Sequence, residues 1–301
     1  MSTPSFNIAA VERDTGLSKD VLRMWERRYG FPVPSRDKHG ERCYPAEQVD
    51  RLRLIKRLMD QGHRPGKLIA TPSEELSALA PRRSKPAAPS ITAESGELEE
   101  LLAMIKQHDA ATYQQAMQQR LARQGLQRFV QDTVAPLTQQ VGEHWEDGRF
   151  EVFEEHLFTE LTKRLLRQAI ATLPGGPRGP RVLLTSVPEE AHLLGLLMVE
   201  ALFALEGAEC IPLGTQMPLL EIGRAAEAHQ ADIVALSFSA AFPQRQIPGL
   251  LQQLRLVLPK DTVLWAGGAG VARIAKTDDA DLLTTLDEAL GALTDWRRQH
   301  P

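Results

Sequence analysis

The stretch Arg181–Gly195, RVLLTSVPEEAHLLG, decides how the C-terminal part of the chain folds. Its apolar run at 182–184 is short and typical of a buried strand, and the apolar segment that follows His192 predicts a helix. His192 therefore lies where a strand gives way to a helix. In an open parallel sheet, ligands bind beyond the carboxyl ends of the strands. We therefore expect a ligand contact in this loop.

The same alternation of strand and helix continues to the end of the chain. Apolar runs predict strands at 182–186, 209–213, 233–238 and 262–266. The intervening patterns predict helices at 192–206, 218–230, 245–258 and near 284–298. Such alternation is typical of a Rossmann-like, doubly wound parallel sheet. Residues 180–301 are predicted to form this α/β domain.

The beginning of the chain, residues 1–78, predicts a small basic domain. Residues 1–70 carry 14 Lys and Arg against 9 Asp and Glu, although the whole chain has a formal net charge of −4. A basic head on an acidic body indicates a polyanionic partner for the head alone. Helices expected at 6–16 and 19–29, the second capped by Ser18, form a helix-turn-helix whose second helix enters the major groove. Two short strands at 35–44 predict a wing, followed by a helix at 45–62.

The middle of the chain connects these two parts. Residues 79–96 are rich in Pro, Ser and Ala without apolar periodicity, which predicts a flexible linker. From 97 to 174, apolar residues recur at steps of three and four, which predicts a four-helix bundle. The sequence thus predicts a multidomain protein of α and α/β parts.

Several properties exclude other classes of protein. No run of about 18 apolar residues suits a membrane span, and the N-terminus lacks the pattern of a secretion signal. Cys43 and Cys210 are too far apart in sequence to suggest a disulfide framework. We expect a cytoplasmic protein that does not bind membranes.

Residues 22–32, LRMWERRYGFP, and the later Arg-Cys-Tyr at 42–44 resemble the MerR-type winged helix-turn-helix. In that family the recognition helix and the wing contact double-stranded operator DNA. Phosphate contacts should dominate, because Arg and Lys release counterions there. Each of these residues is alternatively an ordinary surface group. The resemblance implies DNA contacts by Lys19, Arg23, Arg28, Arg36, Arg42 and Tyr44.

The pattern Glu190-x-His192-x-x-Gly195 resembles the Asp/Glu-x-His-x-x-Gly motif of base-off, His-on cobalamin-binding domains. There the His is the lower axial ligand of cobalt, which implies that role for His192, with Glu190 as its hydrogen-bonding partner. The alternative is a solvent-facing His at the start of a helix. Small residues after the third and fourth predicted strands match the family's Ser-x-Leu and Gly-Gly elements, although a Ser replaces the usual Leu. These pocket residues are Ser237, Ser239, Gly267 and Gly268.

A third resemblance involves the predicted bundle. The spacing of Trp145 and the pair Glu155-His156 is similar to that of light- and cobalamin-responsive MerR-type repressors of the CarH/LitR kind. In that family these side chains cover the upper face of adenosylcobalamin, although here they are alternatively ordinary bundle residues. Light-sensing members have a His directly after the Trp, where this chain has Glu146. His144 lies about 200° round the helix from that position, so it is no obvious substitute.

These observations predict a DNA-binding transcriptional repressor and not an enzyme. We expect light, cobalamin or both to change its homo-oligomeric state, a dimer or a tetramer, and thereby its operator binding. The cofactor, expected to be adenosylcobalamin, would lie between the bundle and the α/β domain. One alternative is a cobalamin-free regulator of the same fold that is controlled by a protein antagonist, such as a separate photoreceptor. A remote alternative is a cobalamin-dependent enzyme module, but no part of the chain remains for a catalytic domain.

Overall fold

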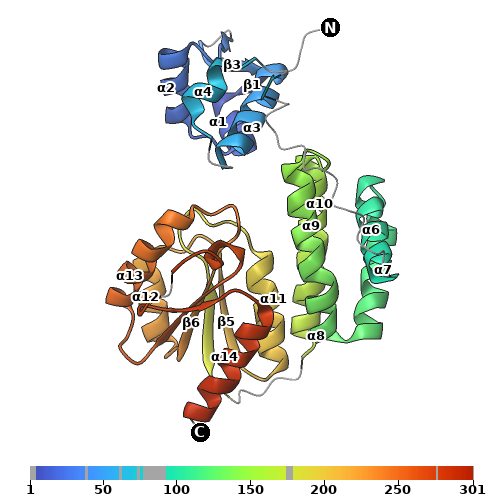
Figure 1. Ribbon diagram of the computed structural model, residues 1–301, viewed down its shortest axis with the longest axis vertical. Helices are drawn as coiled ribbons and strands as arrows, with labels where there is room; N and C mark the ends of the chain where they lie inside the picture. Colours follow the sequence, from blue (N-terminus) through green and yellow to red (C-terminus); the bar gives the residue numbers. More distant parts are fainter. Residues whose placement is uncertain are drawn as a thin grey trace. The chain divides into compact units, whose positions relative to one another are not determined.

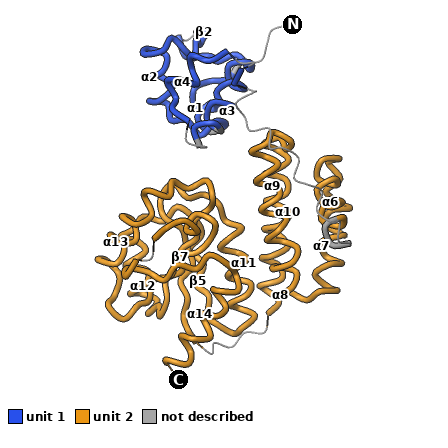
Figure 2. The backbone as a smooth tube through the Cα atoms, in the orientation of Figure 1, with its two compact units in different colours: residues 1–90 blue, residues 91–301 orange. Residues whose placement is uncertain are grey.

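The computed structural model describes residues 5–37, 40–60, 63–72, 75–76, 93–173, 179–275 and 277–300. The chain forms two compact units, Met1–Ser90 and Ile91–Pro301 (Figure 2). Of the predicted linker at 79–96, residues 93–96 belong to a helix, and residues 79–92 lie outside the described part. We describe each unit by itself.

The first unit combines short helices with a three-stranded antiparallel sheet of order β1-β3-β2. The sequence missed β1, because Phe6 pairs with Tyr44 across the sheet instead of starting the first helix. It also missed the short helix α4. Asn7 and Ser18 cap the two helices of the helix-turn-helix by accepting backbone hydrogen bonds. The elements are β1 (Ser5–Asn7), α1 (Ile8–Thr15), α2 (Lys19–Tyr29), β2 (Ser35–Arg36), β3 (Arg42–Pro45), α3 (Ala46–Asp60) and α4 (Pro65–Ala70).

The second unit begins with the predicted helical bundle (Figure 1). One of its helices contains a π-helical turn, η1. Pro136 follows this turn, and its missing N–H removes a regular helical hydrogen bond to Asp132. The bundle consists of α6 (Ala93–Lys106), α7 (Ala110–Gln124), the continuous run α8 (Leu126–Arg128), η1 (Phe129–Val134) and α9 (Ala135–Glu146), and α10 (Val152–Ala171).

The unit ends with a five-stranded parallel sheet of order β5-β4-β6-β7-β8. This confirms the predicted fold class. The sequence missed β8, which has only three residues and one charged side chain. The strands are β4 (Arg181–Thr185), β5 (Glu209–Gly214), β6 (Ile233–Ser237), β7 (Val263–Gly267) and β8 (Asp281–Leu283); the helices are α11 (Leu194–Leu205), α12 (Leu219–Ala228), α13 (Ile247–Val257) and α14 (Leu286–Gln299).

Helices cover both faces of this sheet. Side chains of α12 and α13 share one hydrophobic core with the sheet, and those of α11 and α14 share another. Helix α11 also contributes buried residues to the core of the bundle, namely Leu194, Leu197, Met198, Ala201 and Leu202. Because α11 packs on both partners, it joins the bundle to the sheet and brings the loop before it next to the bundle. No helix in the described part of the chain is both long and apolar enough to cross a membrane.

Candidate cobalamin site and DNA-binding face

The topology of the sheet places the motif residues at one point. Strand β4 pairs with β5 on one side and β6 on the other, so the chain connections change direction between β4 and β6. Ligands of open α/β sheets bind at such a switch point, beyond the carboxyl ends of the strands. His192 lies in the loop after β4, and Ser237 and Ser239 lie at the end of β6.

Glu190 joins the two loops by hydrogen bonds. Its carboxylate is only 1% exposed. Oε1 accepts hydrogen bonds from the backbone N–H of His192 at 2.9 Å and lies 2.7 Å from His192 Nδ1. Oε2 accepts from the backbone N–H and the hydroxyl of Ser239, at 2.7 and 2.8 Å. When Nδ1 donates to Glu190, the neutral ring keeps its free electron pair on Nε2, which is the form that binds metals.

The charges of this pair support each other. The hydrogen bond to Glu190 raises the pKa of His192 against the opposing effect of burial, and the negative charge of Glu155 adds to the increase. Burial alone would raise the pKa of Glu190, but hydrogen bonds from His192 and Ser239 outweigh it and lower that pKa overall. Glu155 belongs to α10, so a carboxylate of the bundle acts electrostatically on the histidine of the sheet domain.

Glycines let the loops around His192 approach each other closely. A Cβ atom at Gly195 would lie 2.6 Å from the hydroxyl oxygen of Ser237, and one at Gly267 would lie 3.2 Å from a backbone oxygen. Gly268 has φ +97°, and its Cβ would lie 2.5 Å from the carbonyl oxygen of Phe238. A side chain at Gly268 would therefore push the loops apart, and a side chain at Gly195 would displace the hydroxyl of Ser237.

The sequence interpretation missed Ser186, which holds the same loop. Its buried hydroxyl donates to the carbonyl oxygen of Glu190 at 2.6 Å and accepts from the backbone N–H of Gln216 at 3.0 Å. The residue links the loop after β4 to the loop after β5. A polar residue directly after an apolar strand was the available signal, but its partner is not evident from sequence spacing.

Three further candidates, an aromatic, a carboxylate and an imidazole, belong to the bundle. Trp145, at the end of α9, packs on the same core as Leu193, the neighbour of His192 in sequence. Glu155 accepts a hydrogen bond from Thr159 at 2.8 Å and lies 2.7 Å from Nδ1 of His156. The His156 side chain is 72% exposed.

His144, on the same helix as Trp145, has a different environment. Its ring packs against Phe150, with the ring centroids 5.6 Å apart. Burial, assisted by the positive charge of Arg149, lowers the pKa of His144. Glu146 is exposed and lies at the end of α9.

The donor set fits a cobalamin. Among the described residues, no group of three or more His, Cys, Asp and Glu side chains could hold a bare metal ion. His192 instead offers a single nitrogen on a side chain that is 61% exposed. One imidazole, oriented by a carboxylate, suits a metal whose other ligands come from a macrocycle.

The DNA-binding candidates lie on α2 and the wing of the first unit. Helix α2 buries Leu22 and Trp25 and exposes Arg23 and Arg28. Arg28 lies over the ring of Tyr29, 5.4 Å from its centroid. In the wing, Arg36 donates to the carbonyl oxygen of Gly40 at 2.7 Å.

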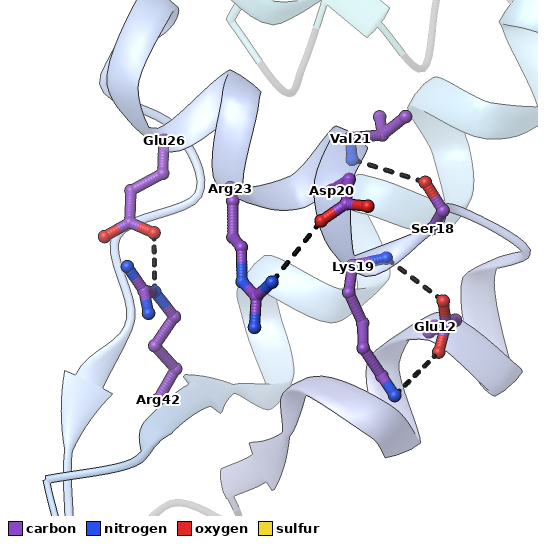
Figure 3. A network of polar contacts seen from close by, with 8 residues as sticks. All are labelled: Glu12, Ser18, Lys19, Asp20, Val21, Arg23, Glu26 and Arg42. Atoms are coloured by element: carbon purple, nitrogen blue, oxygen red, sulfur yellow. Dashed lines mark hydrogen bonds and ion pairs between the residues drawn. The ribbon is translucent and has the colours of Figure 1, made fainter.

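Three of the candidate cations form ion pairs with carboxylates of the same unit (Figure 3). Lys19 Nζ lies 3.4 Å from Glu12, and Arg23 lies 3.3 Å from Asp20. Arg42 Nε donates to Glu26 at 2.8 Å and so connects the wing to α2.

Tyr44 corrects one expectation. We predicted a surface residue that contacts DNA, but its side chain is 0% exposed and packs in the core of the first unit. Burial raises its pKa, and the negative charge of Glu26 adds to the increase. The hydroxyl is buried without a hydrogen-bond partner in the described structure. Tyr44 is therefore a core residue in this conformation.

Known proteins resemble both parts of the chain. Residues 6–69 match the MerR HTH family of regulatory proteins, and residues 97–170 match the B12 binding domain family. The chain is 30% identical over 272 residues to the HTH-type transcriptional repressor CarH of Myxococcus xanthus. This alignment covers 89% of this chain and 90% of CarH. It is 28% identical over 269 residues to the repressor CarA of the same organism, covering 88% of this chain and 87% of CarA.

A solved structure shares the fold of the second unit. The monomethylamine corrinoid protein of Methanosarcina barkeri aligns with a TM-score of 0.53 over 67% of this chain and 99% of that protein. The sequences are 16% identical, so this likeness concerns the fold alone.

Proposed function

The chain belongs to the CarH-like family of MerR-type repressors with a B12-binding domain, and on this basis we propose how its two units sense a signal and bind DNA. The family predicted from the sequence is thus confirmed. The protein is a DNA-binding regulator linked to cobalamin. Both relatives are transcriptional repressors, which favours regulation over the enzyme module considered from the sequence.

We propose that His192 is the lower ligand of cobalt. The observation that carries this proposal is the hydrogen-bond network of Glu190, His192 and Ser239 at the switch point of the sheet. Glu190 holds the imidazole in one tautomer and one orientation, with Nε2 available. Gly195 and Gly268 keep the surrounding loops in close contact.

We propose adenosylcobalamin as the form that is bound. We propose that Trp145, Glu155 and His156 cover the site from the bundle; the electrostatic effect of Glu155 on His192, and the packing of Trp145 on the same core as Leu193, support this. They would enclose an upper ligand and exclude water from it. When bound, this cofactor supplies a cobalt–carbon bond that light can break.

Because Glu146 replaces the His of light-sensing members, the nearest other histidine on the same helix is His144. His144 packs against Phe150 and its pKa is lowered by burial, so it is engaged within the bundle. We therefore propose that the signal is the occupancy of the site and that His144 takes no part in binding the cofactor.

Oligomerisation would connect the signal to DNA. We propose that copies of the chain associate through the second unit as a dimer or a tetramer. Two linked DNA-binding heads gain effective concentration on repeated operator sites. Loss of the assembly would then release DNA without any change in the head itself.

The test combines three measurements on the full chain. The protein is mixed with adenosylcobalamin in the dark and desalted, and its absorption spectrum, size-exclusion volume and operator binding are recorded before and after green light. Retained cobalamin, with a change of oligomer and DNA affinity on illumination, is the expected result. His192→Ala is the matched variant and should lose the His-on spectrum.

The second candidate is a cobalamin-free regulator with a protein antagonist. It is motivated by Glu146, at a position where light-sensing members of the family have His, and by Ser239, which replaces the usual Leu. This alternative gains if desalted protein retains no cobalamin and His192→Ala regulates normally. The first proposal fails in that case.

A further inference from the structure

Several cationic side chains of the first unit form ion pairs with carboxylates of the same unit. Lys19, Arg23 and Arg42 are three of the cations that we place on the DNA face, and each of them has an acidic partner within the first unit. Figure 3 shows each of these cations beside its carboxylate; two of the carboxylates belong to α2 and one to α1. Each carboxylate takes one of the N–H donors of its cation and offsets part of the positive charge that a phosphate would meet, while the other donors of these cations are not used in the pairs.

The three pairs differ in strength because they differ in exposure. The Glu26–Arg42 pair has the shortest distance, and both side chains are less than a third exposed, at 28% and 29%. The Glu12–Lys19 pair is intermediate, at 35% and 43%. Asp20 is 92% exposed and its partner Arg23 49%, and such exposed pairs are weak.

Glu26 holds Arg42 by more than proximity. The hydrogen bond from Arg42 Nε to Glu26 raises the pKa of the guanidinium. A charge-assisted hydrogen bond of this kind is among the stronger polar contacts in proteins. It also joins α2 to β3, so the wing and the recognition helix are connected through this pair.

We propose that Glu12, Asp20 and Glu26 compete with DNA phosphate for the cations of the DNA face. They lower the DNA affinity of a single first unit, so that tight operator binding depends on two or more linked units. This inference rests on the proposed DNA face and adds its regulation. A cation that is already paired releases fewer counterions when it meets DNA, and the displaced carboxylate then repels the phosphates nearby. A switch based on oligomer size requires that a single DNA-binding unit has a low affinity for DNA. The gain in effective concentration from linking units then decides whether the operator is occupied.

Another explanation for the same pairs is purely structural. Glu12 also accepts the backbone N–H of Lys19 at 3.1 Å, which fixes the turn between α1 and α2. Amide variants separate the two explanations, because Gln and Asn keep an acceptor oxygen but remove the charge. A structural role predicts weaker DNA binding by the variants, whereas competition predicts stronger binding.

The experiment measures binding of the full chain, in the state of lowest oligomer size, to a DNA duplex of random sequence over a range of salt. The variants are Glu12→Gln, Asp20→Asn and Glu26→Gln. Asp50→Asn is the matched control, because it makes the same change in net charge. Asp50 is exposed and pairs with Arg53 on α3.

We expect the Glu26→Gln head to bind more tightly than the control. One additional freed cation should steepen the salt dependence by up to about 0.9 in slope, which is on the order of a threefold greater loss of affinity between about 50 and 200 mM salt. Equal affinities of Glu26→Gln and the control, or weaker binding by Glu26→Gln, would overturn the inference. If Glu26→Gln does not fold, the double variant of the other two carboxylates decides by the same criteria.

The DNA face itself is tested separately. Lys19→Ala and Arg42→Ala should each reduce affinity and flatten the salt slope. If they do neither, the proposed DNA face is wrong. If they do both while the carboxylate variants match the control, the DNA face stands and only the competition is refuted.

Discussion

Replacing Glu190 by Gln tests the proposed cobalamin site most directly. The carboxylate accepts four hydrogen bonds, two from His192 and two from Ser239, and it is almost fully buried. An amide offers one acceptor oxygen and places an NH₂ donor where the second oxygen was. Either the backbone N–H of Ser239 or the two donors of His192 therefore lose their acceptor.

The magnitude depends on which partner is lost. A buried donor left without an acceptor costs about 1–3 kcal/mol. Loss of the group that orients a metal-binding histidine typically weakens metal affinity by about 10- to 100-fold. We therefore expect the dissociation constant for adenosylcobalamin to rise about 10- to 100-fold, which corresponds to about 1.4–2.7 kcal/mol.

The assay is a spectroscopic titration with adenosylcobalamin in the dark. It reports both the affinity and the fraction of cofactor in the His-on form. Glu189→Gln is the matched control, because this neighbouring carboxylate is exposed. If Glu190→Gln binds cobalamin as tightly as Glu189→Gln and with the same spectrum, Glu190 does not orient His192 and the proposed role of the carboxylate is refuted.

Three further predictions concern stability and reactivity. Gly268→Ala should lower the free energy of unfolding of the second unit by about 3 kcal/mol in urea, because φ is +97° and the new Cβ meets a carbonyl oxygen. Gly291→Ala is the control in an open helical position and should raise the free energy of unfolding by about 0.5–1 kcal/mol. Equal effects of the two substitutions would contradict this reasoning. Burial would raise the pKa of Glu154, but its hydrogen bonds lower it overall, so its stabilising contribution exists above the ordinary Glu pKa and is lost as pH falls below about 4.5. Circular dichroism at decreasing pH should show this loss, and Glu154→Gln should reduce the pH dependence. Burial raises the pKa of the Cys210 thiol to about 12, so at neutral pH iodoacetamide should label the Cys210 peptide slowly in the native protein and faster after unfolding. Mass spectrometry follows this peptide separately from that of Cys43, the other partly exposed free cysteine, and equally rapid labelling of the Cys210 peptide in both states would contradict the prediction.

The sequence predicted those elements whose residues carry a strong local pattern. Strand β4 and helix α11 are nearly continuous apolar runs, and the structure buries most of their side chains. Strands β1 and β8 have three residues each, which is too short for a periodic signal. They exist because a neighbouring strand offers them hydrogen bonds, and that information is not local.

Tyr44 shows a second kind of limit. Residues 42 and 44 lie two apart in a strand, so both side chains point to the same face. Arg42 reaches the edge of that face and pairs with Glu26, whereas Tyr44 fills the core opposite Phe6. The family pattern identified both positions, but only packing decides which of the two is exposed.

The structure changes the interpretation of Ser239. As a departure from the usual Leu, it favoured a site that no longer binds cobalamin. In the structure it supplies two of the four hydrogen bonds to Glu190, from a position 49 residues away that only the pairing of β4 with β6 brings near. A Leu there would keep the backbone N–H but leave the buried carboxylate without the hydroxyl, and an underpaired buried charge is costly. The hydroxyl of Ser239 completes the pairing of the carboxylate that contacts His192, so this substitution is compatible with the proposed cobalamin site and is no argument against it.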